Sequence, residues 1–270
     1  MERIARIERW IGAGLGALIL SAALAAGQAG ATSYSTDASD LWWNPAESGW
    51  GVQMIQQDRT IFATMYVYAQ SGQPEFYVAV LETTGTAYLW TGTVYRTTGP
   101  WWGAGFNPAL VNEVPVGTMS FQMLTVATAQ LDYTISGVQV TKSVRRMAFA
   151  NERIDGIYLG GAKQAAVSGP CVAAGPIEAG VSITHGGDST VSATMIVGSA
   201  SCTMTNGTYE QHGRFGFVWG NYSCANGETG TISLSEVTVT VDTLTFRYRF
   251  TGTGPGYTCT MEGDFAGVQN

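Results

Sequence analysis

The densest group of residues able to do chemistry lies at residues 41–51, which hold three tryptophans, one asparagine and one carboxylate. Indole rings stack on the apolar faces of sugars or fill pockets in other proteins, and amide and carboxylate groups at the rim fix orientation by hydrogen bonds. The turn dipeptides in this stretch, Asn-Pro and Ser-Gly, favour a folded loop that displays the rings. We therefore predict a ligand-binding site that includes Trp42, Trp43, Asn44, Glu47 and Trp50.

A second tryptophan pair, Trp101 and Trp102, lies in a long turn-rich connection between residues 97 and 115. Connections of this length in compact domains are usually functional. In a meander the loops at one end of the sheet are neighbours, so we expect this connection to share an end with residues 41–51 and add its two rings to the site. The opposite interpretation stays open, in which Trp42, Trp43 and Trp50 close the end of a barrel that holds Trp90 inside.

The elements that must position these rings are strands. Apolar residues alternate with polar ones in about thirteen runs after residue 31, as where Leu244, Phe246, Tyr248 and Phe250 alternate with threonine and arginine. Glycine is abundant, with 35 residues, and no helical period is sustained after residue 31. The pattern predicts an all-β protein built of two antiparallel meander units, each a small up-and-down barrel or a sandwich, after an N-terminal signal helix.

Residues 1–31 are typical of a secretory signal peptide, with a basic start, an apolar run and a small-residue end. The apolar run is short and rich in alanine and glycine, so the mature chain is expected to have no stable membrane span. A shift to glycine, alanine and proline at 156–180 indicates a linker there. The predicted division is a signal peptide at 1–31, a Trp-rich β domain at 37–157 and a disulfide-bonded β domain at 166–270.

The net charge argues against some partners. Removal of residues 1–31, with three arginines and two glutamates, takes the formal net charge from −7 to −8. The only basic cluster, Lys142, Arg145 and Arg146, is interpreted as a solvated strand face rather than a phosphate site. An acidic chain of this kind is a poor ligand for nucleic acid or for an anionic membrane surface. The sequence leaves the oligomeric state open.

Four cysteines, all after residue 170, predict disulfides in an exported chain. Cys202 and Cys224 are symmetric about Gly213, so a hairpin that turns near residues 210–213 would place them opposite one another. Cys171 and Cys259 would then tie the start of the second unit to its last strand. No Cys-x-x-Cys pair is present, and we expect neither a metal site nor a cofactor.

Catalysis has weaker support than binding. A glycan hydrolase would need two converging carboxylates beside an aromatic groove, and the candidates are Glu47, Glu75, Glu82 and Glu113. A serine hydrolase is disfavoured, since His185 and His212 are interpreted as surface turn residues and no nucleophile-elbow pattern accompanies them.

The Trp-Trp-Asn-Pro…Glu-Ser-Gly-Trp-Gly stretch is followed by Gly92-Thr93-Val94-Tyr95-Arg96-Thr97-Thr98-Gly99-Pro100 and by Pro115-Val116-Gly117-Thr118. This set resembles a module of exported proteobacterial β-rich proteins, which occurs alone or appended to secreted hydrolases. The resemblance covers roughly residues 40–150 and implies export and a β-rich fold, with no catalytic residues to carry over.

Together these patterns predict an exported, non-catalytic binding or adhesion module that recognises a glycan or a cell-surface component through its Trp-rich loops. Its destination is the periplasm, the cell surface or the medium. Two alternatives stay open, a secreted glycan-active hydrolase with paired carboxylates and a structural or assembly accessory domain.

Overall fold

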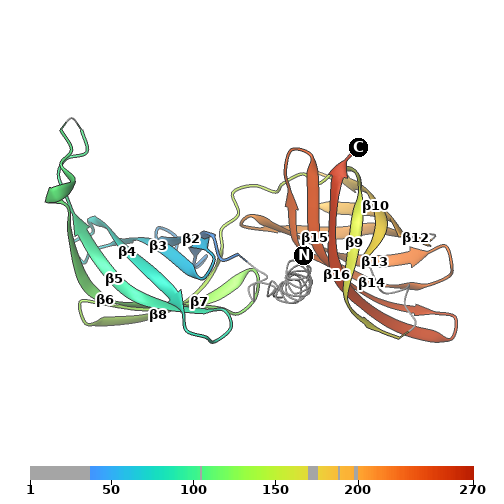
Figure 1. Cartoon of the computed structure of the whole chain (residues 1–270), viewed down its shortest axis with the longest axis horizontal. Helices are drawn as coiled ribbons and strands as arrows, with labels where there is room; N and C mark the ends of the chain where they lie inside the picture. Colours follow the sequence, from blue (N-terminus) through green and yellow to red (C-terminus); the bar gives the residue numbers. More distant parts are fainter. Residues whose placement is uncertain (1–36, 104, 170–175, 188, 198–199) are drawn as a thin grey trace, which may run out of the picture. The chain divides into compact units, whose positions relative to one another are not determined.

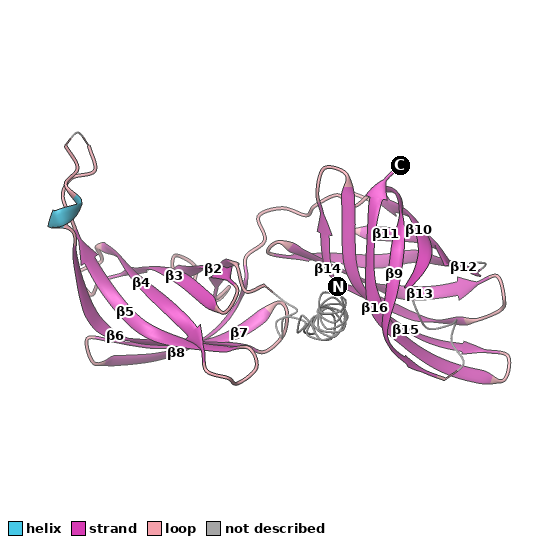
Figure 2. Ribbon diagram, in the orientation of Figure 1, coloured by secondary structure: helices cyan, strands magenta, loops and turns pink. Residues whose placement is uncertain are grey.

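The computed structural model describes residues 37–103, 105–169, 176–187, 189–197 and 200–270, and it confirms the all-β class. The strands form two closed antiparallel barrels of eight strands each, β1 to β8 and β9 to β16. Figure 1 shows the two barrels in chain order, and Figure 2 shows that nearly all of the described chain is strand or loop. The predicted signal helix at 1–31 lies outside the described residues.

The first barrel is an up-and-down meander in which every strand pairs with its neighbours in sequence and β1 also pairs with β8. One short 3-10 helix, η1 (Pro108–Leu110), interrupts the connection between β5 and β6. Its strands are β1 (Asp40–Trp43), β2 (Gly51–Gln57), β3 (Thr60–Tyr68), β4 (Pro74–Thr83), β5 (Leu89–Thr98), β6 (Asn112–Met123), β7 (Thr128–Ile135) and β8 (Val138–Arg146).

The core of the first barrel follows from strand alternation. On β3, Ile61, Ala63 and Met65 point inward and are buried, while Phe62 and Tyr66 point outward and are about half exposed. Successive side chains on a strand face opposite sides, so every strand contributes alternate residues to the interior. Trp90 is fully buried among them, as in the alternative interpretation of the sequence that placed this ring inside a barrel.

The second barrel repeats this topology, and β9 closes it against β16. Its strands are β9 (Gly156–Ser168), β10 (Pro176–His185), β11 (Thr190–Val197), β12 (Ala200–His212), β13 (Phe215–Cys224), β14 (Thr229–Val239), β15 (Thr243–Gly254) and β16 (Tyr257–Gln269). Leu244, Phe246, Tyr248 and Phe250 of β15 all lie in its core, as their alternation predicted.

The linker expected within residues 156–180 is not there, because most of that stretch forms the strands β9 and β10. The chain instead leaves β8 at Arg146 and enters β9 at Gly156. At least one of the glycines that suggested a linker, Gly160, is needed for close strand packing. A Cβ on Gly160 would lie 2.0 Å from the carbonyl oxygen of Ala266 on β16, so a larger residue cannot occupy this position without moving the backbone.

The second barrel carries the predicted disulfide between Cys202 and Cys224. The strands turn between His212 and Phe215, and an irregularity between Met204 and Thr208 shifts the register by one residue. That shift brings the two cysteines directly opposite one another. Cys259 is also disulfide-bonded, and Cys171, its expected partner, lies outside the described residues.

Candidate functional site: one end of the first barrel

The topology places the two Trp-rich segments at the same end of the first barrel. Connections in an up-and-down barrel alternate between its two ends, so residues 44–50, 69–73, 99–111 and 136–137 share one end. The connections 44–50 and 99–111 are four strands apart in a ring of eight, which puts them half a circumference from each other. The shared end matches the expectation from the sequence, but the two loops rise from different sides of the barrel.

Trp42 is a core residue. Its side chain is fully buried and packs edge-on against Phe121 at 5.0 Å between ring centroids, and its Nε1 donates to the carbonyl of Ala38 at 2.9 Å. The guanidinium of Arg146 lies 4.6 Å from the centroid of the Trp42 ring. The prediction that Trp42 contacts a ligand is therefore wrong. The alternative interpretation, in which this ring is buried in the barrel, applies to it.

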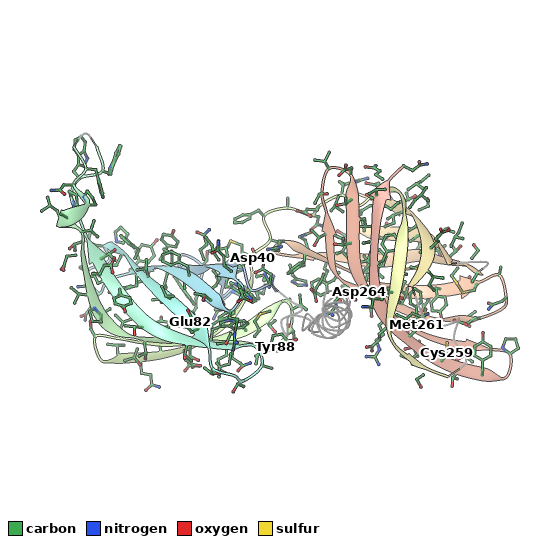
Figure 3. All side chains as sticks on the ribbon, in the orientation of Figure 1. Asp40, Glu82, Tyr88, Cys259, Met261 and Asp264 are labelled. Atoms are coloured by element: carbon green, nitrogen blue, oxygen red, sulfur yellow. A yellow bond between two sulfur atoms is a disulfide. The ribbon has the colours of Figure 1, made fainter. Side chains whose placement is uncertain are left out.

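Arg146 is the buried cation that completes this part of the core. Its guanidinium donates to the carboxylate of Asp40 at 3.1 Å, to Val126 O at 2.6 Å, and to the carbonyls of Ser39 and Asp37. Burial is the main cause that lowers the pKa of Arg146, and the bond to Asp40 opposes it. Figure 3 labels Asp40 on the first barrel. This buried cation differs from the expectation that Arg146 lies on a solvated strand face.

The other predicted site residues of the 41–51 segment, Trp43, Asn44, Glu47 and Trp50, are partly covered. Trp43 lies on the opposite face of β1 from Trp42 and pairs with Arg145 of β8. Asn44 accepts the backbone N–H of Ala46 on its side-chain oxygen at 3.0 Å, an Asx turn. The side-chain oxygen of Asn44, which was expected to fix the orientation of a ligand, is thus already hydrogen-bonded within the loop.

Glu47 and Trp50 form a cluster with Lys142 of β8. Lys142 Nζ lies 2.7 Å from one oxygen of Glu47 and 2.9 Å from the other, and Trp50 Nε1 donates to Glu47 at 3.0 Å. The ammonium also lies 5.8 Å from the centroid of the Trp50 ring. The hydrogen bond from Lys142 is the main cause that lowers the pKa of Glu47.

A similar cluster lies on β4 and β5 at the same end of the barrel. Arg96 donates to Glu75 at 3.2 Å and to the hydroxyl of Tyr77 at 2.9 Å, and Tyr77 donates to Glu75 at 2.7 Å. The guanidinium lies 5.5 Å from the centroid of the Tyr77 ring. Of the three residues in this cluster, only Glu75 was a candidate from the sequence, although its spacing of two from Tyr77 places both on one face of the strand.

The connection between β5 and β6 has a different character. Trp101 is 69% exposed and Trp102 is 83% exposed, with ring centroids 5.9 Å apart and planes inclined by 50°. Figure 1 shows this connection as an extension that projects beyond the ends of β5 and β6. Phe106, Leu110 and Val111 are also exposed. We call residues 99–111 the β5–β6 loop; its Ala104 lies outside the described residues.

Two local features shape the β5–β6 loop. The ring of Trp101 lies against the backbone of Gly103, where an added Cβ would fall 2.2 Å from a ring carbon. Asn107 caps η1, because its side-chain oxygen accepts the N–H of Ala109 at 3.0 Å. Both indole rings nevertheless remain largely exposed.

The carboxylates do not have the environment of a glycosidase pair. A general acid needs a raised pKa, whereas that of Glu47 is lowered, and Glu75 is bound to Arg96. Glu82, labelled in Figure 3, accepts a hydrogen bond from Thr60 on the outer wall at 2.8 Å. Glu113 is exposed at the start of β6. Among the described residues, no group of three or more His, Cys, Asp or Glu side chains has a metal-binding arrangement.

One of the two histidines, His185, differs from the expectation. His185 is a buried residue at the end of β10 rather than a surface turn residue, and burial is the main cause that lowers its pKa. Its ring lies 4.5 Å from that of Tyr209. His212 is partly covered and lies 3.1 Å from Glu210. Both belong to the second barrel.

Comparison with known proteins adds little. No protein-family model matches the chain, and no curated protein matches it. Among solved structures, a "putative outer membrane protein" of Bacteroides fragilis is similar, with 14% sequence identity and a TM-score of 0.33 over 87% of this chain and 96% of that chain. A likeness of this strength carries no argument about function. In the described part of the chain, no helix has the length and apolar character to cross a membrane.

Proposed function

We propose that this protein is an exported, non-catalytic binding module that attaches to a component of a cell envelope or cell surface through the β5–β6 loop. The observation that carries the proposal is the exposure of Trp101 and Trp102 at 69% and 83% on a projecting connection. Exposed aromatic rings in a cluster are typical of contact sites, since burying them against a partner is favourable.

The rest of the barrel supports binding over catalysis. Buried apolar side chains occupy its interior, and two of the candidate carboxylates at the loop end, Glu47 and Glu75, are held in ion pairs with Lys142 and Arg96. The disulfide between Cys202 and Cys224 and the signal-like residues 1–31 support export. The contact site in this proposal is narrower than the sequence suggested, because Trp42 is in the core and Asn44 holds its own turn.

Cosedimentation tests this proposal. The purified protein is mixed with isolated Gram-negative cell envelopes and with insoluble polysaccharides, and its bound fraction is compared with that of the Trp101→Ala/Trp102→Ala variant. Trp219→Ala is the matched control, since Trp219 is also exposed but lies on β13 of the second barrel. We expect the double variant to lose binding and the control to keep it. Equal binding by all three proteins would refute the proposed site.

A further inference from the structure

We infer that the β5–β6 loop binds the interfacial region of a lipid bilayer, and that the lipid it takes is neutral or zwitterionic. This inference rests on the proposed function and names its partner. The apolar, uncharged side chains of the loop support it, as does the scarcity of side chains that could form hydrogen bonds with a sugar.

The β5–β6 loop presents an apolar surface to solvent. Five large side chains of the loop are between 41% and 83% exposed, namely Trp101, Trp102, Phe106, Leu110 and Val111. They occur on a single connection that extends past the barrel (Figure 1), and Figure 3 shows side chains standing out around that extension. Tryptophan favours the boundary between lipid headgroups and acyl chains, where its ring is covered and its N–H stays hydrated.

The loop and the residues beside it carry no charge. Sixteen consecutive residues, 97–112, contain no charged side chain. The nearest cation, Arg96, is bound to Glu75 and Tyr77 at the barrel end rather than directed along the loop. A segment without charge enters the headgroup region at little electrostatic cost. The formal net charge of −8 after removal of residues 1–31 then disfavours anionic lipids and selects neutral or zwitterionic ones.

The loop has few polar side chains, and the one with an acceptor oxygen is hydrogen-bonded within the loop. Asn107 is bonded to the N–H of Ala109, and η1 satisfies the N–H groups of Leu110 and Val111 on the carbonyls of Asn107 and Pro108. Two prolines, Pro100 and Pro108, have no N–H to satisfy. A sugar-binding platform combines its rings with free donors and acceptors that fix hydroxyl groups. The side chains of this loop offer little of that capacity, because among its described residues only Asn107 carries an acceptor oxygen, and that oxygen is bonded to Ala109.

The length of the loop fits the depth of the interface. Thirteen residues that leave and return give about six residues in each direction, or at most roughly 20 Å of reach. Interfacial segments typically enter the headgroup boundary by about 5–10 Å. The loop can therefore seat its rings in the interface while the barrel stays in water. A single such contact gives weak, reversible attachment.

The experiment measures the partition of the full chain onto phosphatidylcholine vesicles by cosedimentation at low and high salt. Residues 1–31 contain an apolar run and, where retained, are common to every variant, so only differences between variants report on the loop. We expect Trp101→Ala/Trp102→Ala to lower the partition coefficient by about tenfold or more. The conservative Trp101→Phe/Trp102→Phe variant should keep most of it, Trp219→Ala should match the wild type, and salt should have little effect. Unfolding curves verify that each variant is folded.

Other outcomes overturn the inference in distinct ways. If the wild type and the double alanine variant partition equally, the loop is not the lipid contact. If binding needs phosphatidylglycerol and is lost at high salt, the attachment is electrostatic and the inference is wrong. If vesicles are not bound but cell envelopes or polysaccharides are, in a manner that requires Trp101 and Trp102, the bilayer inference fails while the proposed function stands. If nothing is bound, both fail.

Discussion

The two Trp-rich segments of the first barrel are alike in sequence and opposite in structure. Each has an adjacent tryptophan pair, turn residues and glycine, and the connections 44–50 and 99–111 lie at the same end of the barrel, although Trp42 itself pairs with Arg146, the last residue of β8. Yet Trp42 is fully buried beside Phe121 and Arg146, whereas Trp102 is the most exposed tryptophan of the described chain.

The difference comes from the position of each ring along the chain, within a strand or beyond the end of one. Trp42 lies on β1, where its partners in register, Val52 and Arg146, also point inward. Trp101 and Trp102 lie beyond the end of β5, where no neighbouring strand exists to cover them. A tryptophan pair therefore becomes core or contact surface according to its position relative to the strand end, and composition alone does not distinguish the two.

The largest expected effect that tests this contrast is on stability. Trp42→Ala should lower the free energy of unfolding by about 3–5 kcal/mol, because it removes a fully buried indole and leaves a cavity between Phe121 and Arg146. Denaturant unfolding followed by circular dichroism measures this change. A loss below about 1 kcal/mol would mean that the ring is not a core residue in solution.

Sequence patterns predicted the long alternating strands well and this contrast poorly. The runs on β3 and β15 show period two over eight residues or more, which fixes the inward face. β1 has four residues, of which Leu41, Trp42 and Trp43 are all apolar, so no alternation marks the buried one. β9 was missed because its glycines and alanines resemble a linker until the close approach of β16 is known.

The sequence predicted one part of the candidate site, the β5–β6 loop, and not the other. A long uncharged connection with two tryptophans is visible in the sequence, and its exposure follows from the lack of any neighbouring strand. The partners of Trp42 and Glu47 were not predictable, because Arg146 and Lys142 come from the last strand of the barrel and are brought near only by its closure. Ring closure pairs residues that no local pattern relates.

A second large effect is expected at the cation that covers Trp42. Arg146→Met keeps most of the side-chain volume but removes the donors for Asp40 and for the carbonyls of Ser39 and Val126. We expect a loss of roughly 3 kcal/mol in unfolding free energy, since a buried group that loses its charged partner is costly. The same denaturant series measures it, with Arg145→Met as the control, because Arg145 is exposed on the same strand. Equal losses for the two variants would contradict a special role for Arg146.

A smaller effect is expected in the pH dependence of the 41–51 segment. The pKa of Glu47 is lowered by Lys142, so the folded state holds the carboxylate charged more strongly than the unfolded chain does. Its contribution to stability is therefore present above the ordinary value of 4.5 and is lost as the pH falls through the lower folded pKa. Wild type and Glu47→Gln should differ in unfolding free energy at pH 7 and converge in acid. A difference that stays constant down to pH 3 would show that the charge of Glu47 is not what matters.

The smallest expected effect completes the contrast with Trp42. Trp102→Ala should change the free energy of unfolding by less than about 0.5 kcal/mol, since its ring is 83% exposed and its ring contact, with Trp101, lies within the same loop. The measurement is the same denaturant unfolding used for Trp42→Ala, so the two tryptophans are compared on one scale. If Trp102→Ala instead costs about 2 kcal/mol or more, the ring packs against the protein in solution. The loop would then be a folded part of the barrel end, and its rings would not be free to meet a partner. A small change in stability together with a large loss of vesicle binding is the combination that separates a contact residue from a core residue.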